Sequence, residues 1–359
     1  MSEGFRVKSR FKDYEVVFTN EFVETLSRQH NENSFFLVDA ELAELYRDKM
    51  SLVLHEERFF PIAANEHNKT LDFCGSLIKE LVEKGIRKNS MIVAVGGGVI
   101  QDIAAFISSI LYRGVEWTFY PTTLLAQADS CIGSKTSINL GNFKNLVGNF
   151  YPPSRIYIDI GFLETLPAVE IKSGIGEMLH YYFIAGSEKA RLLMAGYDEF
   201  VKAPRMLRDF ISASLDIKKK VVEADEFDRN ERNLFNYGHT FGHAIETVSG
   251  YAVNHGQAVT MGMDIANFIS LDQDFLKRED FDLMHTILER NLPEFSLDES
   301  SIDNYLKALS RDKKNIGKEL GCILSRGPGA MIKVQLPIDK RLMKIILAYF
   351  DLPSYQAQV

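Results

Sequence analysis

Two histidines, His239 and His243, lie four positions apart in the stretch NYGHTFGHAIE. On a helix this spacing places both imidazoles on one face, as in metal sites of the form H-E-x-x-H. The intervening residues are Thr-Phe-Gly, so the glutamate that activates water in metalloproteases is missing. His255 and Glu177 lie in other helical segments, and two histidines with one carboxylate leave the open fourth position of a catalytic zinc site. The alternative for any single histidine is that it caps or packs a helix.

Polar and mostly cationic side chains accompany these residues. Arginine binds a carboxylate through two hydrogen bonds, whereas lysine binds a phosphate as a point charge. We expect Lys219, Lys220 and one residue of the Lys313–Lys314 pair to be ordinary solvated surface. The candidates for contact with a small, multiply anionic substrate are Lys135, Lys144, Asn145, Lys218, Arg232, Asn236 and one of Lys313 and Lys314.

A triple glycine follows an apolar run in VAVGGGVIQD, at Gly96–Gly98. Glycines let backbone amides approach a phosphate, and the following helix adds its positive N-terminal end. A pyrophosphate would fit there, although the pattern is not G-x-G-x-x-G and a tight packing corner explains the glycines equally well. Thr122, Thr123 and Asp129 follow the next predicted strand at its carboxyl end, where open α/β sheets bind ligands.

The first part of the chain alternates short apolar runs with helical patterns. A helix is predicted over 69–86, ending near Gly85, and another follows the triple glycine. Such alternation favours a mainly parallel sheet covered by helices. The predicted strands are 14–18, 34–40, 58–64, 90–95, 117–123 and 154–160.

The chain from residue 163 onward is dominated by long helical patterns. We therefore predict an α/β domain over 1–162 and a helical domain over 163–359. The predicted helices of the second domain include 168–186, 205–225, 238–250, 255–272 and 339–350.

The bulk composition is that of a globular protein of 359 residues, with 46% hydrophobic and 25% charged residues. A net charge of -8 argues against a general binder of nucleic acid or anionic membranes. The odd number of cysteines, three, argues against a disulfide framework. The sequence lacks a signal-peptide pattern and an apolar stretch of membrane-spanning length, so a cytoplasmic location is expected.

A series of motifs gives the chain a family resemblance that covers nearly its whole length. They are, in order, GGGVIQD, YRGV, PTTLLAQADS, KTSIN, KNLVGNFYPP, DEFDRNERNLFNYGHTFGHAIE and HGQAV. With these motifs the chain resembles the sugar phosphate cyclases, and most closely the 3-dehydroquinate synthases. The resemblance implies a Rossmann-like α/β N-terminal domain and a mainly α-helical C-terminal domain. It also implies NAD and a divalent metal, usually zinc with cobalt as the other candidate, in one site between the domains.

The resemblance implies roles for particular residues. The metal ligands would be Glu177, His239 and His255, and Arg113 matches a residue that reaches into the partner's site in family homodimers. The implied NAD contacts are Asp39, Glu66, Lys69, Gly97, Gly98, Asp102, Thr122, Thr123, Asp129, Lys135, Lys144, Phe162 and Thr165. The implied substrate contacts are Asp129, Lys135, Asn145, His180, Lys218, Arg232, Asn236, His243 and Lys314.

The chemistry implied by the resemblance is a phosphate-eliminating carbon–oxygen lyase reaction. A substrate hydroxyl is transiently oxidised, phosphate leaves by β-elimination, the hydride returns, and an intramolecular aldol reaction closes a carbocycle. The expected substrate is 3-deoxy-arabino-heptulosonate 7-phosphate or a related sugar-acid phosphate, because Arg232 suits a carboxylate. His243 also argues against the valiolone-type cyclases, which usually lack the second histidine of this motif.

The sequence departs from the family pattern at two positions. His180 stands where dehydroquinate synthases carry a lysine, and Gln101 stands where they usually carry a glycine. A histidine is shorter and mostly neutral at pH 7, so a different sugar phosphate, as in 2-deoxy-scyllo-inosose synthases, is the first alternative. A metal-dependent polyol dehydrogenase is a further alternative, though it leaves the cationic residues unexplained. For Gln101, beside the glycine turn, we expect an effect on NAD affinity alone.

Overall fold

The structure, a computed structural model, describes residues 4–29, 31–50, 56–141, 143–311, 315 and 319–352. It contains two compact units. The sheet unit comprises Met1–Leu166 and Lys218–Phe227, and the helical unit comprises Pro167–Ile217 and Asp228–Val359. The main change between units therefore falls near the predicted boundary at 162–163, and a short later segment returns to the first unit.

The sheet unit is built on a seven-stranded sheet, with all neighbouring strands parallel except the β1–β2 pair. A separate β7–β8 hairpin spans Ile138–Leu140 and Phe143–Val147. In spatial order the strands of the main sheet are β1 Gly4–Val7, β2 Tyr14–Thr19, β9 Arg155–Asp159, β6 Glu116–Pro121, β5 Met91–Gly96, β3 Ser34–Asp39 and β4 Phe59–Ile62.

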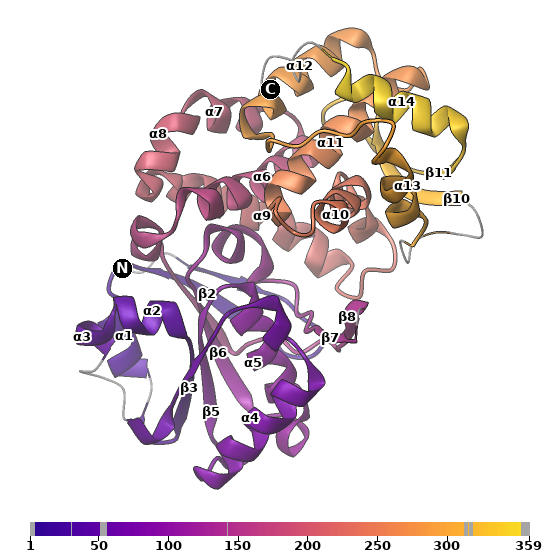
Figure 1. The fold of residues 1–359 in the computed structure, drawn as a ribbon. Helices are drawn as coiled ribbons and strands as arrows, with labels where there is room; N and C mark the ends of the chain where they lie inside the picture. Colours follow the sequence, from indigo (N-terminus) through magenta and orange to yellow (C-terminus); the bar gives the residue numbers. More distant parts are fainter. Residues whose placement is uncertain are drawn as a thin grey trace. The chain divides into compact units, whose positions relative to one another are not determined.

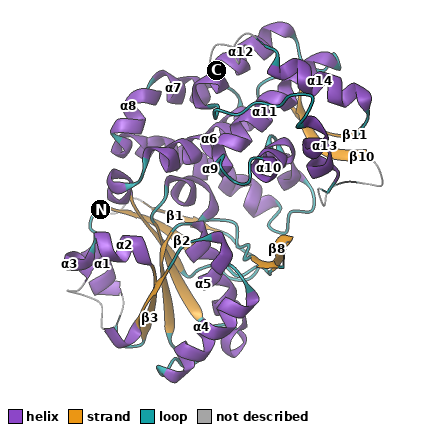
Figure 2. Cartoon of the chain, in the orientation of Figure 1, coloured by secondary structure: helices purple, strands orange, loops and turns teal. Residues whose placement is uncertain are grey.

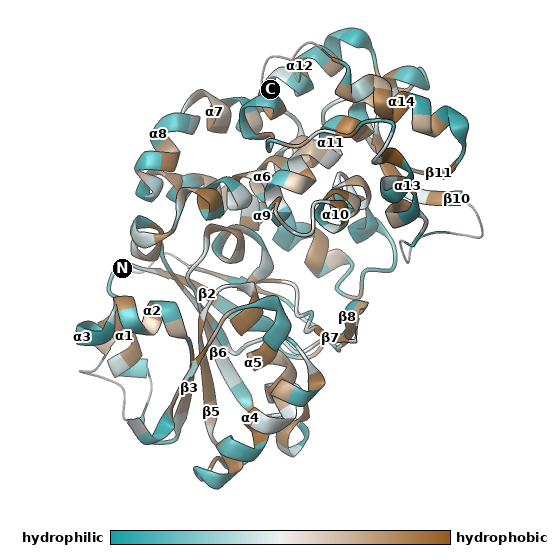
Figure 3. Cartoon of the chain, viewed as in Figure 1, coloured by the Kyte–Doolittle hydropathy of each residue, from teal (hydrophilic) through white to brown (hydrophobic). Residues whose placement is uncertain are grey.

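Helices cover both sides of this sheet, with α1–α3 on one side and α4 and α5 on the other (Figure 1). Phe22 and Leu26 of α1 pack with Val93 and Val95 of β5 in one core cluster. The central strands β3 and β5 are correspondingly among the hydrophobic parts of the unit (Figure 3). The helices are α1 Phe22–Gln29, α2 Ala40–Leu45, α3 Arg47–Met50, α4 Leu71–Glu83 and α5 Gly98–Ile110.

The predicted elements of this unit are confirmed. The six predicted strands correspond to β2, β3, β4, β5, β6 and β9, and the predicted helix 69–86 corresponds to α4. Local chemistry sets the ends of α4, because the Thr70 hydroxyl accepts a hydrogen bond from the amide of Phe73 and Gly85 follows at a φ of 92°. The fold class is therefore the predicted one in this half, a mainly parallel α/β sheet.

Segment 218–227 is bound to the beginning of the chain. The carboxylate of Glu226 accepts hydrogen bonds from the Ser9 hydroxyl and the Arg10 amide, both at 2.7 Å. The Ser134 hydroxyl donates to the same carboxylate at 2.9 Å. The ring of Phe227 lies against Phe150 with a centroid distance of 5.0 Å. These contacts explain why the residues directly after α9 belong to the sheet unit.

The helical unit consists mainly of helices with one two-stranded hairpin (Figure 2). This composition confirms the predicted helical C-terminal half. Within the described residues, no helix combines the length and apolar character needed to cross a lipid bilayer. The elements are α6 Ala168–Ala185, α7 Glu188–Ala195, α8 Tyr197–Lys202, α9 Arg208–Ala224, α10 His239–Val248, α11 His255–Asp272, α12 Arg278–Leu288, α13 Ile302–Ser310, β10 Glu319–Ser325, β11 Met331–Pro337 and α14 Lys340–Phe350.

Glycines allow α11 to approach two other helices closely. A methyl group on Gly176 of α6 would collide with the carbonyl oxygen of Gly256 in α11, and one on Gly256 would collide with that of Ser173. Between α10 and α11, a methyl group on Gly242 would lie 2.8 Å from the carbonyl oxygen of Ala258. The backbones of α6, α10 and α11 therefore approach more closely than larger residues at these positions would allow.

Candidate active site

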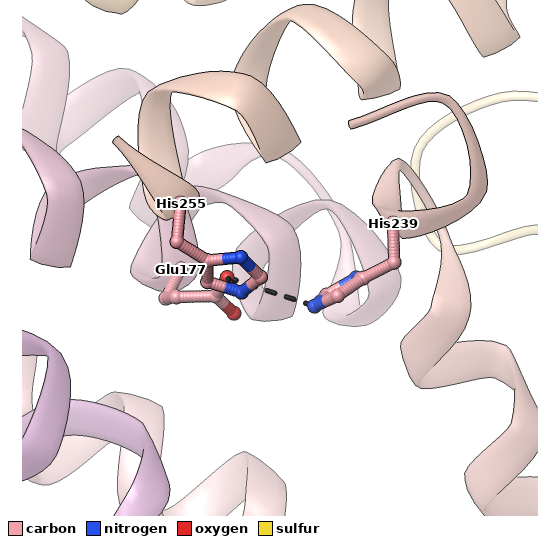
Figure 4. Close-up of side chains that lie close together, drawn as sticks. All are labelled: Glu177, His239 and His255. Carbon is pink, nitrogen blue, oxygen red and sulfur yellow. Dashed lines mark ion pairs between the residues drawn. The ribbon is translucent and has the colours of Figure 1, made fainter. Parts of the chain in front are cut away.

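Three side chains from three helices converge in the helical unit (Figure 4). Glu177 lies in the middle of α6, whereas His239 and His255 are the first residues of α10 and α11. The Glu177 Oε1 atom lies 3.6 Å from His239 Nε2 and 3.2 Å from His255 Nε2. The structure thus brings together the three side chains that the sequence predicts as metal ligands.

The spacing of these atoms fits a tetrahedral metal ion. Bond lengths of about 2.1 Å place neighbouring ligand atoms about 3.4 Å apart in a tetrahedral zinc site. The Oε1 atom of Glu177 is buried and accepts no hydrogen bond of normal geometry from the described residues, although both imidazoles face it. A buried carboxylate oxygen between two imidazole nitrogens is the donor set expected for Zn²⁺ or Co²⁺.

The electrostatic environment of His255 favours positive charge at this point. Burial lowers the pKa of His255, but the nearby carboxylates of Glu177 and Glu246 outweigh burial and raise that pKa well above 6.5. Glu246 Oε2 lies 3.2 Å from Nδ1 of His255. Nδ1 of His255 donates to Glu246, so Nε2 is the nitrogen at which a metal ion would replace a proton, beside Glu177.

A main-chain carbonyl oxygen and a neighbouring aromatic ring fix the orientation of the His239 ring. Its Nδ1 atom lies 3.2 Å from the carbonyl oxygen of Tyr237, which leaves Nε2 for a metal. His180 is fully buried, and its ring packs edge-on against that of His239 with centroids 5.0 Å apart. Tyr181 and Phe235 also contact His180. The predicted contact of His180 with substrate stays a prediction, and its burial favours an indirect role.

His243 lies on the exposed side of the same region. Its ring stacks on that of His255 with centroids 5.7 Å apart, one turn of α10 beyond His239. The ligand atoms of His243, Glu246 and His255 also lie within 4.8 Å of one another. Because Glu246 already faces Nδ1 of His255, we interpret it as the partner of a ligand rather than as part of a second metal site.

The glycine turn lies in the sheet unit at the carboxyl end of β5. Gly97 caps α5 and Gly98 begins it, so the positive end of this helix faces the turn. A methyl group on Gly97 would lie 2.9 Å from Thr123 Cγ2, so a larger residue would crowd the turn. Thr122 adjoins it, because its amide donates to the carbonyl oxygen of Gly96 at 3.0 Å.

A polar network adjoins the first turns of α5. The buried Lys69 ammonium donates to Asp102 Oδ2 at 2.9 Å and lies 3.6 Å from Glu66 Oε1. Burial raises the pKa of Asp102, while Lys69 and hydrogen bonds from Ser137 oppose that shift. Ser137 lies 2.9 Å from Asn145 through their side-chain oxygens. Predicted NAD contacts and one predicted substrate contact are therefore connected within one unit.

Asp129 and Lys218 form a buried pair in the sheet unit. The Lys218 ammonium donates to both the carboxylate Oδ1 and the carbonyl oxygen of Asp129, each at 2.7 Å. The Lys218 residue is only 6% exposed. A buried ammonium bound on one side by a carboxylate can present its remaining donor to an anionic group.

The other predicted site residues lie in varied environments. Arg232 is buried, Asn236 and Asp39 are half-buried, and Phe162 packs in the core cluster with Phe22. Lys314 lies outside the described residues. Of the predicted site residues in the sheet unit, those that are exposed are Arg113, Lys135, Lys144, Asn145 and Thr165.

Some residues of the site were not predicted. Glu246 lies seven residues after His239 on the same face of α10, so helical periodicity alone could have indicated it. Ser137 and Asn139 had no such signal, because their partners Asp102 and Glu66 lie far away in sequence. Glu246, Ser137 and Asn139 each contact a residue that was predicted, namely His255, Asp102 and Glu66.

Two family profiles match adjacent parts of the chain. Residues 59–173 match the family described as 3-dehydroquinate synthase N-terminal. Residues 174–315 match the family described as 3-dehydroquinate synthase C-terminal. Together the matches contain the glycine turn, the Asp129–Lys218 pair and all three residues of the metal-ligand set.

Individual relatives agree with the family profiles. The 3-dehydroquinate synthase of Thermodesulfovibrio yellowstonii is 37% identical over 317 residues, covering 85% of this chain and 87% of the relative. That of Dictyoglomus thermophilum is 34% identical over 356 residues, covering 96% and 98%. A crystal structure of 2-deoxy-scyllo-inosose synthase, complexed with carbaglucose-6-phosphate, NAD⁺ and Co²⁺, shares the fold with a TM-score of 0.84 at 23% identity, over 96% of this chain and 100% of that chain.

Proposed function

Because this chain belongs to the 3-dehydroquinate synthase family, we propose that it releases phosphate from 3-deoxy-arabino-heptulosonate 7-phosphate, or a related sugar-acid phosphate, and closes a carbocycle. The family predicted from the motifs is thereby confirmed. The reaction would be that of a carbon–oxygen lyase, with no net oxidation or reduction.

The proposed cofactors are NAD and a divalent cation, zinc or cobalt. Glu177, His239 and His255 would hold the cation, and the glycine turn at Gly97 and Gly98 would receive the pyrophosphate of NAD. When bound, the cation polarises a substrate oxygen and the nicotinamide accepts and returns a hydride. The solved 2-deoxy-scyllo-inosose synthase with NAD⁺ and Co²⁺ supports this proposal.

The protein's own side chains would bind and orient the anionic substrate. Lys218, fixed by Asp129, offers a positive charge at one defined place. Arg232 offers a planar guanidinium suited to a carboxylate. Because Lys218 and Arg232 are both buried, their charges are screened less by solvent than exposed charges would be.

One observation carries the proposal more than any other, namely the convergence of Glu177, His239 and His255 on one point at ligand spacing. The test is a phosphate-release assay with the heptulosonate phosphate, NAD and Zn²⁺. We expect inorganic phosphate without accumulation of NADH, and loss of both phosphate release and bound zinc in Glu177→Gln. Accumulation of NADH without phosphate would instead indicate a polyol dehydrogenase.

A second candidate is a cyclase for a sugar phosphate that lacks a carboxylate. The complete burial of His180, in place of the family's lysine, favours it. A panel of sugar phosphates, assayed with the wild type and His180→Lys, separates the two candidates. Arg232→Gln provides the second criterion, because it should raise KM for a carboxylated substrate and leave KM for an uncarboxylated one nearly unchanged.

We also propose a cytoplasmic homodimer, in which Arg113 reaches the partner's site. Arg113 is exposed and has a φ of 61°, a backbone conformation that non-glycine residues adopt infrequently. Light scattering of the purified protein gives the oligomeric state. An inactive Arg113→Ala protein whose activity returns on mixing with inactive Glu177→Gln protein would indicate a shared site.

A further inference from the structure

Gln101, the residue that departs from the family's glycine, makes a reciprocal pair of hydrogen bonds with Ser130. Its Nε2 group donates to the carbonyl oxygen of Ser130, and the Ser130 hydroxyl donates to its Oε1 atom, each at 2.6 Å. The Gln101 residue is 7% exposed. Both polar ends of the amide are therefore engaged by one residue, and loss of the side chain would leave a partly buried carbonyl without this donor.

Ser130 ends an unusual piece of backbone. Residues Ala126–Ser130 form a π-helix, which closes with the amide of Cys131 donating to the carbonyl oxygen of Ala126 at 3.1 Å. π-helical turns are rare in proteins, and those that occur are often found at functional sites. The fully buried Gln127 fixes its middle, donating through Nε2 to the carbonyl oxygens of Pro121 and Asp159. Gln101 fixes its end.

Asp129, the residue before Ser130, is the partner of Lys218. The ammonium of Lys218 binds two oxygens of Asp129, and one of these is the carbonyl oxygen of the peptide unit that leads into Ser130. A buried ion pair is stabilising only when its geometry is good. A shift of Ser130 would move that carbonyl oxygen and hence the ammonium that it binds.

We propose that Gln101 is a positioning residue for Lys218, acting through Ser130 and the π-helical turn rather than on NAD affinity. All four residues of this chain of contacts lie in the sheet unit. Gln101 also lies in the first turn of α5, directly after the glycine turn, so the device connects the proposed dinucleotide site with the substrate-binding lysine. The inference rests on the proposed function where it assigns substrate binding to Lys218.

The test compares Gln101→Ala, Ser130→Ala and the double variant with the wild type. Gln101→Glu serves as a variant of nearly the same shape that loses the donor to the Ser130 carbonyl. We expect kcat/KM for the sugar phosphate to fall about tenfold in Gln101→Ala, as for the loss of one buried hydrogen-bond pair. The NAD dissociation constant, measured without substrate, should stay within about twofold.

Measurements on the double variant and of the melting temperature complete the experiment. Because Gln101 and Ser130 act as one pair, Ser130→Ala should add little to Gln101→Ala. A purely stabilising role would change the melting temperature without this pattern in kcat/KM. If NAD binding weakens while kcat/KM at saturating NAD is unchanged, or if the two substitutions are additive, the proposal is wrong.

A failure of the proposed function is distinguishable from a failure of this inference. If the wild type turns over no sugar phosphate, the proposed substrate class is wrong, and hydrogen exchange then decides the role of Gln101. Gln101→Ala and Gln101→Glu should speed amide exchange in 126–131 and leave exchange in β3 unchanged. Unaltered exchange in 126–131 would overturn the inference whatever the substrate is.

Discussion

At the scale of single residues, the site depends on side chains that orient other side chains. His255 uses both ring nitrogens, with Nδ1 facing Glu246 and Nε2 facing Glu177. His239 uses Nδ1 toward the Tyr237 carbonyl oxygen and keeps Nε2 for the site. In each of these two histidines, therefore, the partner of one ring nitrogen determines which nitrogen is left for the proposed metal ion.

Replacing Glu246 should weaken metal binding without removing a ligand. We expect Glu246→Ala to raise the zinc dissociation constant about 10- to 100-fold, and Glu246→Gln to have a smaller effect, because glutamine keeps an acceptor but loses the charge. Competition with a coloured chelator measures this constant. Glu188→Gln, an exposed change on α7, is the control and should leave it unaltered. Equal zinc affinity in all four proteins would show that Glu246 does not orient His255.

The sequence predicts the residues that carry chemistry better than those that position them. Glu177, His239 and His255 could be proposed because whole motifs of the chain match a family whose metal ligands occupy these positions. Gln101 could be noticed only as a departure, since nothing in its neighbourhood indicates Ser130 as its partner. Phe162, predicted as an NAD contact, lies in the core cluster, and its predicted role stays a prediction.

At the scale of elements, the metal-ligand set depends on how closely helix backbones approach. Glu177 follows Gly176 in α6, and His255 precedes Gly256 in α11, so the two glycines at the crossing adjoin two of the three residues of that set. The fit is close in both directions, since neither position has room for a methyl group. The chain thus places a glycine directly beside each of two proposed metal ligands, Glu177 and His255.

Gly256→Ala should therefore affect both stability and metal binding. The added methyl group meets the Ser173 carbonyl, and separating α6 from α11 should cost about 2 kcal/mol of unfolding free energy or more. Zinc retention should fall with it, because His255 moves away from Glu177. Urea unfolding and metal analysis of the purified protein measure the two effects.

Gly75→Ala provides the matched control for this change. Gly75 lies inside α4 with no atom within 4 Å of an added methyl group, so alanine should leave the unfolding free energy unchanged or raise it by up to about 1 kcal/mol. Full zinc retention and normal stability in Gly256→Ala would show that the crossing tolerates more separation than the structure indicates.

Elements with strong periodicity were predictable, and those that depend on distant partners were not. The strands β3 and β5 are continuous apolar runs, and α11 is a long apolar-rich segment, so each was predicted. The hairpin β10–β11 was not assigned, because the two strands are specified chiefly by pairing with each other around the sequence SRGPGA. The π-helix at Ala126–Ser130 had no signal, since its backbone is fixed by side chains from elsewhere.

At the scale of the whole molecule, a buried cluster of three polar side chains joins the helices α11, α12 and α14 of the helical unit. The fully buried Asp264 of α11 accepts hydrogen bonds from Tyr349 of α14 at 2.8 Å and lies 2.7 Å from Nδ1 of His285 in α12. Burial lowers the pKa of His285, but Asp264, with Glu289 and Asp282 nearby, outweighs it and raises that pKa above 6.5. The protonated form of His285 is thus favoured by folding.

This group predicts a pH dependence of stability. A histidine whose pKa is higher in the folded state stabilises fully below its unfolded pKa and loses that contribution as pH rises through the folded pKa. We expect the difference in unfolding free energy between wild type and His285→Gln to be largest near about pH 5.5 and to shrink toward about pH 8.5. Denaturant unfolding of the wild type and of His285→Gln at several pH values measures this difference in unfolding free energy. A difference that is constant or grows with pH would contradict the assignment.

The return of segment 218–227 to the sheet unit has a consequence for how the protein is made. Ser9, Arg10 and Ser134 find their shared partner, Glu226, only after the ribosome has synthesised the helices α6 to α9. A nascent chain that has reached residue 166 therefore contains all seven strands of the sheet but not the carboxylate to which Ser9, Arg10 and Ser134 are hydrogen-bonded. A gene cut at that point would encode an incomplete unit without Lys218, so neither half of this protein can be obtained from a single uninterrupted stretch of codons.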